Sequence, residues 1–255
     1  MFRNLYADTR NILLSRGFHI ALRVIAIYQI FYFLLIKIVF IFALKQTMAA
    51  EEVAFIFANI AAFLVTAATL YISEREFSNG CIRNKIISGV RRTDAFLSAV
   101  IGGMLQGALY AMFACVISTV ISVLFTGGYM TFSPPEIADY WLIITMACMT
   151  IGAFSTSLIM IFGGSKICYV IGLLIAFVIK VTNAFVLDAL YPTKGFCKLT
   201  GTKLMAYRFI DRFIPYSYLA SEPHYDMPSY LIGCGGLLII SVVIGLIVFN
   251  KKELS

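Results

Sequence analysis

The sequence has few charged residues: Asp, Glu, Lys and Arg make up 13% of its 255 positions, whereas hydrophobic residues make up 61%. An ordinary soluble domain contains about 25% charged residues. This scarcity of charge excludes a typical soluble enzyme and places the chain among membrane proteins. The net charge is +7, and most of the Lys and Arg lie beside the ends of the hydrophobic segments. The excess of basic residues is therefore interpreted as a sign of membrane topology and not of nucleic-acid binding.

Motifs for catalysis and metal binding are also lacking. The sequence contains no GxxxxGK[ST] phosphate-binding loop, no HExxH motif and no CxxC pair, and its two histidines are far apart. Cys197 is the one cysteine in a predicted outer loop, so no intrachain disulfide is expected. We therefore predict no catalytic residue, no metal site and no cofactor bound by this chain, so that any ATP hydrolysis belongs to a separate subunit.

Long hydrophobic segments recur along the whole chain. A helix needs about 20 apolar residues to cross a bilayer, and six segments reach this length. The sequence thus predicts an all-α membrane protein with one transmembrane domain over residues 1–255. The six predicted spans are His19–Leu44, Val53–Ile72, Ala95–Leu124, Tyr140–Phe162, Ile167–Leu190 and Tyr230–Phe249.

The basic residues are distributed unevenly on the two sides of these spans. Twelve Lys and Arg fall on the side that contains both termini, and six fall on the other side. Because cytosolic loops are enriched in Lys and Arg, both termini are predicted to be cytosolic. The chain is then a multi-pass protein of a plasma membrane.

Two segments outside the spans have helical amphipathic patterns. Residues 1–17 predict a helix on the inner leaflet, with a disordered basic leader as the alternative. Its apolar positions are Phe2, Leu5, Tyr6, Ile12 and Leu13, and its polar positions are Arg3, Asn4, Asp8, Arg10 and Asn11. Residues 191–229 predict an outer amphipathic segment, resting on the interface or partly re-entrant. Its apolar residues Leu204, Met205, Phe209, Ile210 and Phe213 alternate with Lys203, Arg208, Asp211 and Arg212.

The most informative segment is the hydrophilic stretch 73–93, which the charge pattern places in the cytosol. Ile82, Ile86, Ile87 and Val90 recur at helical spacing, while Arg83, Asn84, Lys85, Arg91 and Arg92 fill the other positions. This pattern predicts a short amphipathic helix that lies on the membrane surface or docks into another protein. Gly80 is expected to end the second span in a left-handed conformation. The alternative is a basic loop that only sets the topology.

This stretch resembles a known family. The run Glu74-Arg75-Glu76-Phe77-Ser78-Asn79-Gly80, followed by Ile82, Asn84-Lys85, Gly89 and Arg91-Arg92, is similar to the loop after the second span of type-two ABC exporter permeases. The run Phe213-Ile214-Pro215-Tyr216-Ser217 looks like the proline turn of that family's outer segment. The similarity of layout extends over the whole chain; Cys81 departs from the small polar residue common at that position.

The resemblance implies the permease subunit of a bacterial ABC exporter. Two permeases, identical or related, would bind two ATPase subunits that hold ATP and Mg. The cargo would be amphipathic or lipophilic, with antimicrobial or toxin-like peptides as the first choice and lipophilic drugs as the second. The alternatives are a non-transporting peptide sensor or immunity protein, and an ion-coupled secondary transporter. The implied coupling residues are Glu74, Glu76, Phe77, Gly80, Arg83, Asn84, Lys85, Gly89, Arg91 and Arg92.

Polar residues inside the spans are candidates for a translocation path. Lys180 is predicted to lie near the bilayer centre, where a charge must face protein, water or a partner. It would line a cavity or have a structural role. Phe177 and Asn183 flank it, and Gln29 and Gln106 are candidates for a cavity or for hydrogen bonds between helices. The pairs Gly103/Gly107 and Ser241/Gly245 predict close packing of helices.

Overall fold

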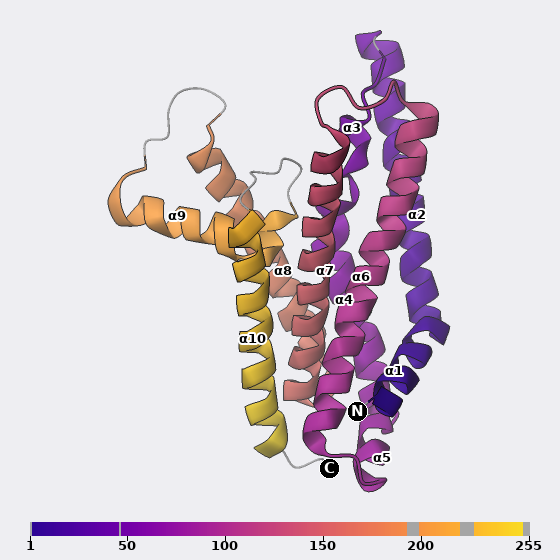
Figure 1. The fold of residues 1–255 in the computed structure, drawn as a ribbon, viewed down its shortest axis with the longest axis vertical. Helices are drawn as coiled ribbons and strands as arrows, with labels where there is room; N and C mark the ends of the chain where they lie inside the picture. Colours follow the sequence, from indigo (N-terminus) through magenta and orange to yellow (C-terminus); the bar gives the residue numbers. More distant parts are fainter. Residues whose placement is uncertain (1, 46, 193–198, 220–226, 252–255) are drawn as a thin grey trace.

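The computed structural model of the protein describes residues 2–45, 47–192, 199–219 and 227–251. Within these residues the regular elements are all helices. Six helical segments are long and apolar enough to cross a membrane, judged by length and composition. They run mainly along the long axis of the molecule (Figure 1). The predicted all-α class with six spanning helices is thus confirmed in its coarse form, while Cys197 lies outside the described residues.

The elements follow one another in a simple order. Most predicted spans correspond to one helix, but η1 is a π-helical turn that continues α2, and α3 precedes α4. A 3-10 turn, η2, follows α9. The elements are α1 (Phe2–Leu14), α2 (Arg16–Val39), η1 (Phe40–Leu44), α3 (Glu51–Ala54), α4 (Phe57–Ser78), α5 (Cys81–Ile87), α6 (Arg92–Phe125), α7 (Pro134–Phe162), α8 (Ile167–Leu190), α9 (Gly201–Phe213), η2 (Pro215–Tyr218) and α10 (Met227–Lys251).

Local sequence signals explain where several helices begin. The Ser15 side chain accepts a hydrogen bond from the Phe18 amide at 3.1 Å, which separates α1 from α2. At the start of α7, Ser133 and Glu136 form a capping box, in which the Glu136 carboxylate accepts from the Ser133 amide at 2.8 Å. Pro134 occupies the first turn, where a missing amide hydrogen costs nothing.

Glycines allow α6 and α7 to approach most closely at the centre of the bundle. A Cβ added at Gly103 would lie 2.8 Å from the carbonyl oxygen of Gly152, and one added at Gly107 would overlap the Cys148 carbonyl. A Cβ at Gly245 of α10 would likewise overlap the Phe96 ring of α6. The close packing predicted for both small-residue pairs is therefore confirmed. Both α7 and α10 pack closely against α6 at these glycines.

The ends of the chain lie at one end of the bundle. Figure 1 places α1, α5 and the last turn of α10 there, whereas α3 and α9 lie toward the other end. A hydrogen bond from Arg92 Nη1 to the Asn250 carbonyl, at 3.3 Å, joins the start of α6 to the end of α10. This agrees with an even number of crossings.

Two boundaries differ from the prediction at the segment 73–93. Residues 73–78 are the last turns of α4, so Glu74, Glu76 and Phe77 belong to a helix and not to a loop. The helix continues because no breaking residue occurs before Gly80. The following helix, α5, ends at Ile87, so Val90 lies beyond it.

Candidate functional site: the α5 region

Two glycines define the ends of α5. Gly80 has φ +70°, and its amide donates to the Phe77 carbonyl at 3.0 Å, which closes the end of α4. Gly89 has φ +92°; its amide donates to Ile86 O at 3.0 Å, and the Val90 amide donates to Lys85 O at 3.1 Å. These two bonds form a Schellman motif. The left-handed conformation expected at Gly80 is confirmed, and a second one at Gly89 ends the helix before Val90.

One face of α5 is fixed to the bundle. Ile82 is buried and belongs to an apolar cluster with Phe96 of α6 and Phe249 of α10, against which Ile86 also packs. The same cluster contains Met160 of α7. The α5 helix is therefore packed against the ends of several spanning helices.

The opposite face of α5 is exposed and contains Arg83, Asn84 and Ile87, which we call the α5 outer face. Ile87 is 73% exposed, although it belongs to the same apolar set as the buried Ile82. The reason is geometric: Ile87 lies five residues from Ile82, which rotates it by about 140° around the helix axis. The α5 outer face thus combines an exposed aliphatic residue with an arginine, a residue that is enriched at protein interfaces.

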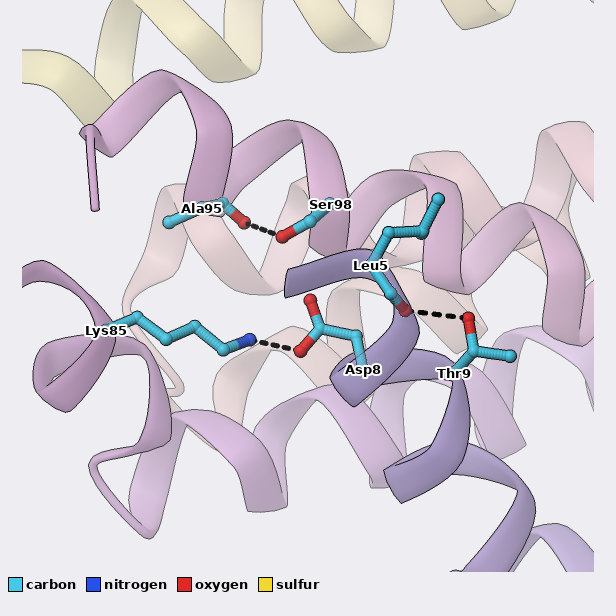
Figure 2. A network of polar contacts seen from close by, with 6 residues as sticks. All are labelled: Leu5, Asp8, Thr9, Lys85, Ala95 and Ser98. Carbon is cyan, nitrogen blue, oxygen red and sulfur yellow. Dashed lines mark hydrogen bonds and ion pairs between the residues drawn. The ribbon is translucent and has the colours of Figure 1, made fainter. Parts of the chain in front are cut away.

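An ion pair connects α5 to the N-terminal helix. Lys85 Nζ donates to Asp8 Oδ1 of α1, and Figure 2 shows the two side chains pointing toward one another. Asp8 is only 1% exposed. The amphipathic pattern placed Asp8 on the polar face of α1, away from the protein; this placement is wrong, because α1 packs along α6 with Asp8 turned inward.

Glu76 adds a second carboxylate to this cluster. It interacts electrostatically with both Asp8 and Lys85. Within the described residues, Asp8 Oδ2 and Glu76 Oε1 are buried and have no hydrogen-bond partner. Three ionisable groups from α1, α4 and α5 thus interact at this end of the bundle, and the Asp8 carboxylate is the most buried of them.

The remaining predicted coupling residues have separate contacts. Glu74 accepts a hydrogen bond from Ser78 Oγ at 2.6 Å within α4. Phe77 packs against Gly164, where an added Cβ would lie 2.8 Å from its ring, so the α7–α8 turn rests on the end of α4. Arg92 bonds to α10 as described above, while Arg91 is exposed. The predicted set therefore divides into anchoring residues and the exposed residues of the α5 outer face and Arg91.

The predicted translocation residues are distributed over two places. Lys180 Nζ donates to the Leu219 carbonyl, and Asn183 Nδ2 donates to the Ser217 carbonyl at 3.3 Å. These two residues hold the η2 turn against α8. Phe177 is exposed on the same helix.

Gln29 and Gln106 lie in the packed interior on other helices. Gln29 Nε2 donates to the Ala114 carbonyl at 3.1 Å, which joins α2 to α6, as predicted for a hydrogen bond between helices. Gln106 Nε2 donates to the Tyr110 hydroxyl at 2.8 Å within α6. None of the five predicted translocation residues lines the groove between α2, α4 and α8 or the groove between α8, α9 and α10.

Two apolar grooves were not anticipated from the sequence. One, of about 770 Å³, lies between α2, α4 and α8, and its wall includes Tyr28, Phe63, Tyr71 and Tyr169. The other, of about 480 Å³, lies between α8, α9 and α10. A glycine that faces an aromatic side chain, as Gly17 faces Tyr71, is the sequence signal that could have indicated the first groove. Small residues are common in membrane helices, so this signal does not single out a groove.

No protein-family model and no curated protein sequence matches the chain. The geometry of α5 and of the grooves is therefore the basis on which a function is assigned. That geometry offers a short helix packed on the ends of the spanning helices, and two apolar grooves.

Proposed function

We propose that the chain is the permease subunit of an ABC exporter in a bacterial plasma membrane. The termini and α5 would face the cytosol, where a separate ATPase subunit hydrolyses Mg-ATP. The observation that supports this proposal best is the two-sided character of α5. Its outer face exposes Ile87 beside Arg83, while Ile82 and Lys85 on its other side hold the spanning helices.

This arrangement suits the transmission of movement. A partner that grips the α5 outer face displaces a short helix whose ends are closed by glycine motifs. Because the helix is packed on α6 and α10 and ion-paired to α1, its displacement moves those helices together. Packed interiors respond to such a force by shifting between discrete arrangements. A loop that only set the topology would need neither the buried Ile82 nor the ion pair.

The exposed apolar surfaces support a second permease copy and a lipophilic cargo. Only a small share of α2 and α8 is buried in the single chain, and the 770 Å³ groove runs between these helices and α4. Its lining is apolar and aromatic, as in sites that bind small lipophilic molecules. An amphipathic peptide or a lipophilic drug is the cargo class that this surface fits, and an identical or related permease is the partner that would enclose it.

The test is a reconstitution. The chain is purified from its native membrane together with the ATPase subunit that binds it, and both are placed in lipid vesicles with a labelled amphipathic peptide. We expect ATP-dependent accumulation of the peptide and peptide-stimulated ATP hydrolysis. Peptide binding without accumulation would instead indicate a sensor or immunity protein. Accumulation driven by an ion gradient without ATP would indicate a secondary transporter.

A further inference from the structure

The second groove has the shape of an elongated slot along α10. Its α10 wall includes Ile232, Gly236 and Ile240, at i, i+4 and i+8, so it extends about 12 Å along the helix axis. Ile175 and Ile179 of α8 form the opposite wall. The volume of about 480 Å³ lies in the range of ligand sites, which is about 300–1,000 Å³.

Helix α9 covers one end of this slot. Phe209 and Phe213 of α9 belong to the lining, and Gly233 of α10 fits tightly beneath them, since an added Cβ would lie 2.6 Å from the Phe213 carbonyl oxygen. Three residues further along, Gly236 has no atom within 4 Å of an added Cβ. The first glycine therefore joins α10 to the end of α9, and the second leaves the slot open.

The polar side of α9, next in sequence to the two phenylalanines that line the slot, carries a positive charge. Lys203, Arg208 and Arg212 are exposed, and Asp211 is the one acidic residue of the helix, so its net charge is +2 (three basic residues minus one acidic). Arg208, Asp211 and Arg212 all act electrostatically on Tyr191 at the end of α8, which places them at this corner of the molecule. Apolar walls in the slot and cations on the adjoining helix α9 match the two parts of a membrane lipid.

We propose that this slot is a binding site for an anionic phospholipid, with one acyl chain between α8 and α10 and its phosphate beside Arg208 and Arg212. The proposal depends on the helices crossing a membrane and does not depend on ATP-driven transport. A second copy of the chain is the less suitable occupant. In a two-fold symmetric contact it would place its own basic α9 against this one.

The two open glycines of α10 provide a matched pair of variants. An added Cβ at Gly236 meets no atom within 4 Å, so Gly236→Phe directs its ring into the slot, whereas Gly235 is equally open but does not line the slot. Each chain is purified, reconstituted in nanodiscs of equal phosphatidylglycerol and phosphatidylcholine, washed with detergent and analysed by native mass spectrometry. We expect the wild type and Gly235→Phe to retain phosphatidylglycerol and Gly236→Phe to lose it.

The basic residues are tested by their effect on headgroup choice. Arg208→Gln with Arg212→Gln should lower the preference for phosphatidylglycerol over phosphatidylcholine by about fivefold for each arginine near the membrane surface, while leaving lipid retention itself in place. Both substitutions lie on an exposed helix and leave the bundle core unchanged. An unchanged preference in this variant would overturn the assignment of the phosphate to α9.

The proposal is overturned if the wild type retains no lipid after washing, or if Gly236→Phe retains as much as Gly235→Phe. Thermal unfolding of each variant shows whether the bundle has folded. If Gly236→Phe does not fold, Gly236→Leu repeats the comparison with a smaller side chain against Gly235→Leu. Transport is not a readout here, so loss of lipid binding and failure of the exporter proposal are separate results.

Discussion

Lys85 of α5 is ion-paired to Asp8 of α1, and the aspartate is 1% exposed while the lysine side chain is 17% exposed. The two residues are 77 positions apart in the sequence, so the pair joins two segments that only the fold brings together. Glu76 of α4 lies close enough to interact with both charges. The end of the bundle that we assign to the cytosol is therefore held together by charge as well as by apolar packing.

This asymmetry of burial predicts unequal effects of breaking the pair. Lys85→Met leaves the Asp8 carboxylate buried without its cation and beside Glu76, and should lower the free energy of unfolding by about 3–5 kcal/mol. Asp8→Asn should cost less, because Lys85 is partly exposed and still faces Glu76. The double variant should recover part of the loss. Thermal unfolding in detergent measures all three, and strictly additive effects would show that the pair contributes nothing.

The contact between α6 and α7 predicts which glycine substitutions are tolerated. Gly107→Ala drives a methyl group into the Cys148 carbonyl, and should destabilise the protein by about 1–3 kcal/mol as overpacking does. Gly235→Ala is the control, since its added methyl group meets nothing within 4 Å and alanine favours helices. Unfolding temperatures compare the two. Equal temperatures for both variants would contradict the close packing.

Lys180 should behave as a structural residue rather than as part of a path. Lys180→Met removes the donor to the Leu219 carbonyl, and should loosen the η2 turn while Asn183 still holds Ser217. We expect faster amide hydrogen exchange at residues 215–219 and an unchanged preference among cargo peptides. A changed preference with unchanged exchange would instead place Lys180 in a cargo cavity.

Glu51 is predicted to hold the turn between α6 and α7. Its Oε1 accepts hydrogen bonds from the amides of Met130 at 2.6 Å, Thr131 at 2.5 Å and Phe132 at 3.2 Å. Glu51→Ala removes this acceptor and should expose residues 126–133 to limited proteolysis. Glu51→Gln keeps a carbonyl oxygen in place and should be cut more slowly. Similar cleavage of both variants and the wild type would show that the turn is held by other contacts.

The α5 outer face is predicted to be necessary for coupling but not for folding. Ile87→Ala removes an exposed side chain, so the purified permease should unfold at its usual temperature while ATP-dependent peptide transport falls. Leu14→Ala is the control, because Leu14 is similarly exposed, at 68% against 73%, but lies on α1. Glu76→Gln tests the anchoring side, and the double change of Arg91 and Arg92 to Gln tests one exposed and one anchoring arginine together. Full transport by Ile87→Ala would remove α5 from the interface.

The sequence alone determined the helices. Six hydrophobic runs, separated by glycine, proline and charge, predicted six spans, and the predicted bounds of α8 agree with the structure. The glycine at position 80 predicted a left-handed end to α4, and the GxxxG pair at Gly103 and Gly107 predicted close packing. These features depend on interactions within one helix or on the small size of a residue, and such properties can be read from adjacent positions.

Only the tertiary structure decided which helix faces meet. The pattern of α1 placed Asp8 on the polar face of an interfacial helix, yet Asp8 is buried; the pattern of α5 put Ile82 and Ile87 in one apolar set, yet only Ile82 is buried. In a membrane protein, hydrophobicity does not distinguish a lipid-facing residue from a packed one, because lipid tails are as apolar as the protein interior. The partner of Lys85, the carbonyl bound by Lys180 and the two grooves depend on contacts between distant segments. These contacts are decided by how side chains of particular shape fit when the helices pack, and no single segment of the sequence contains that information.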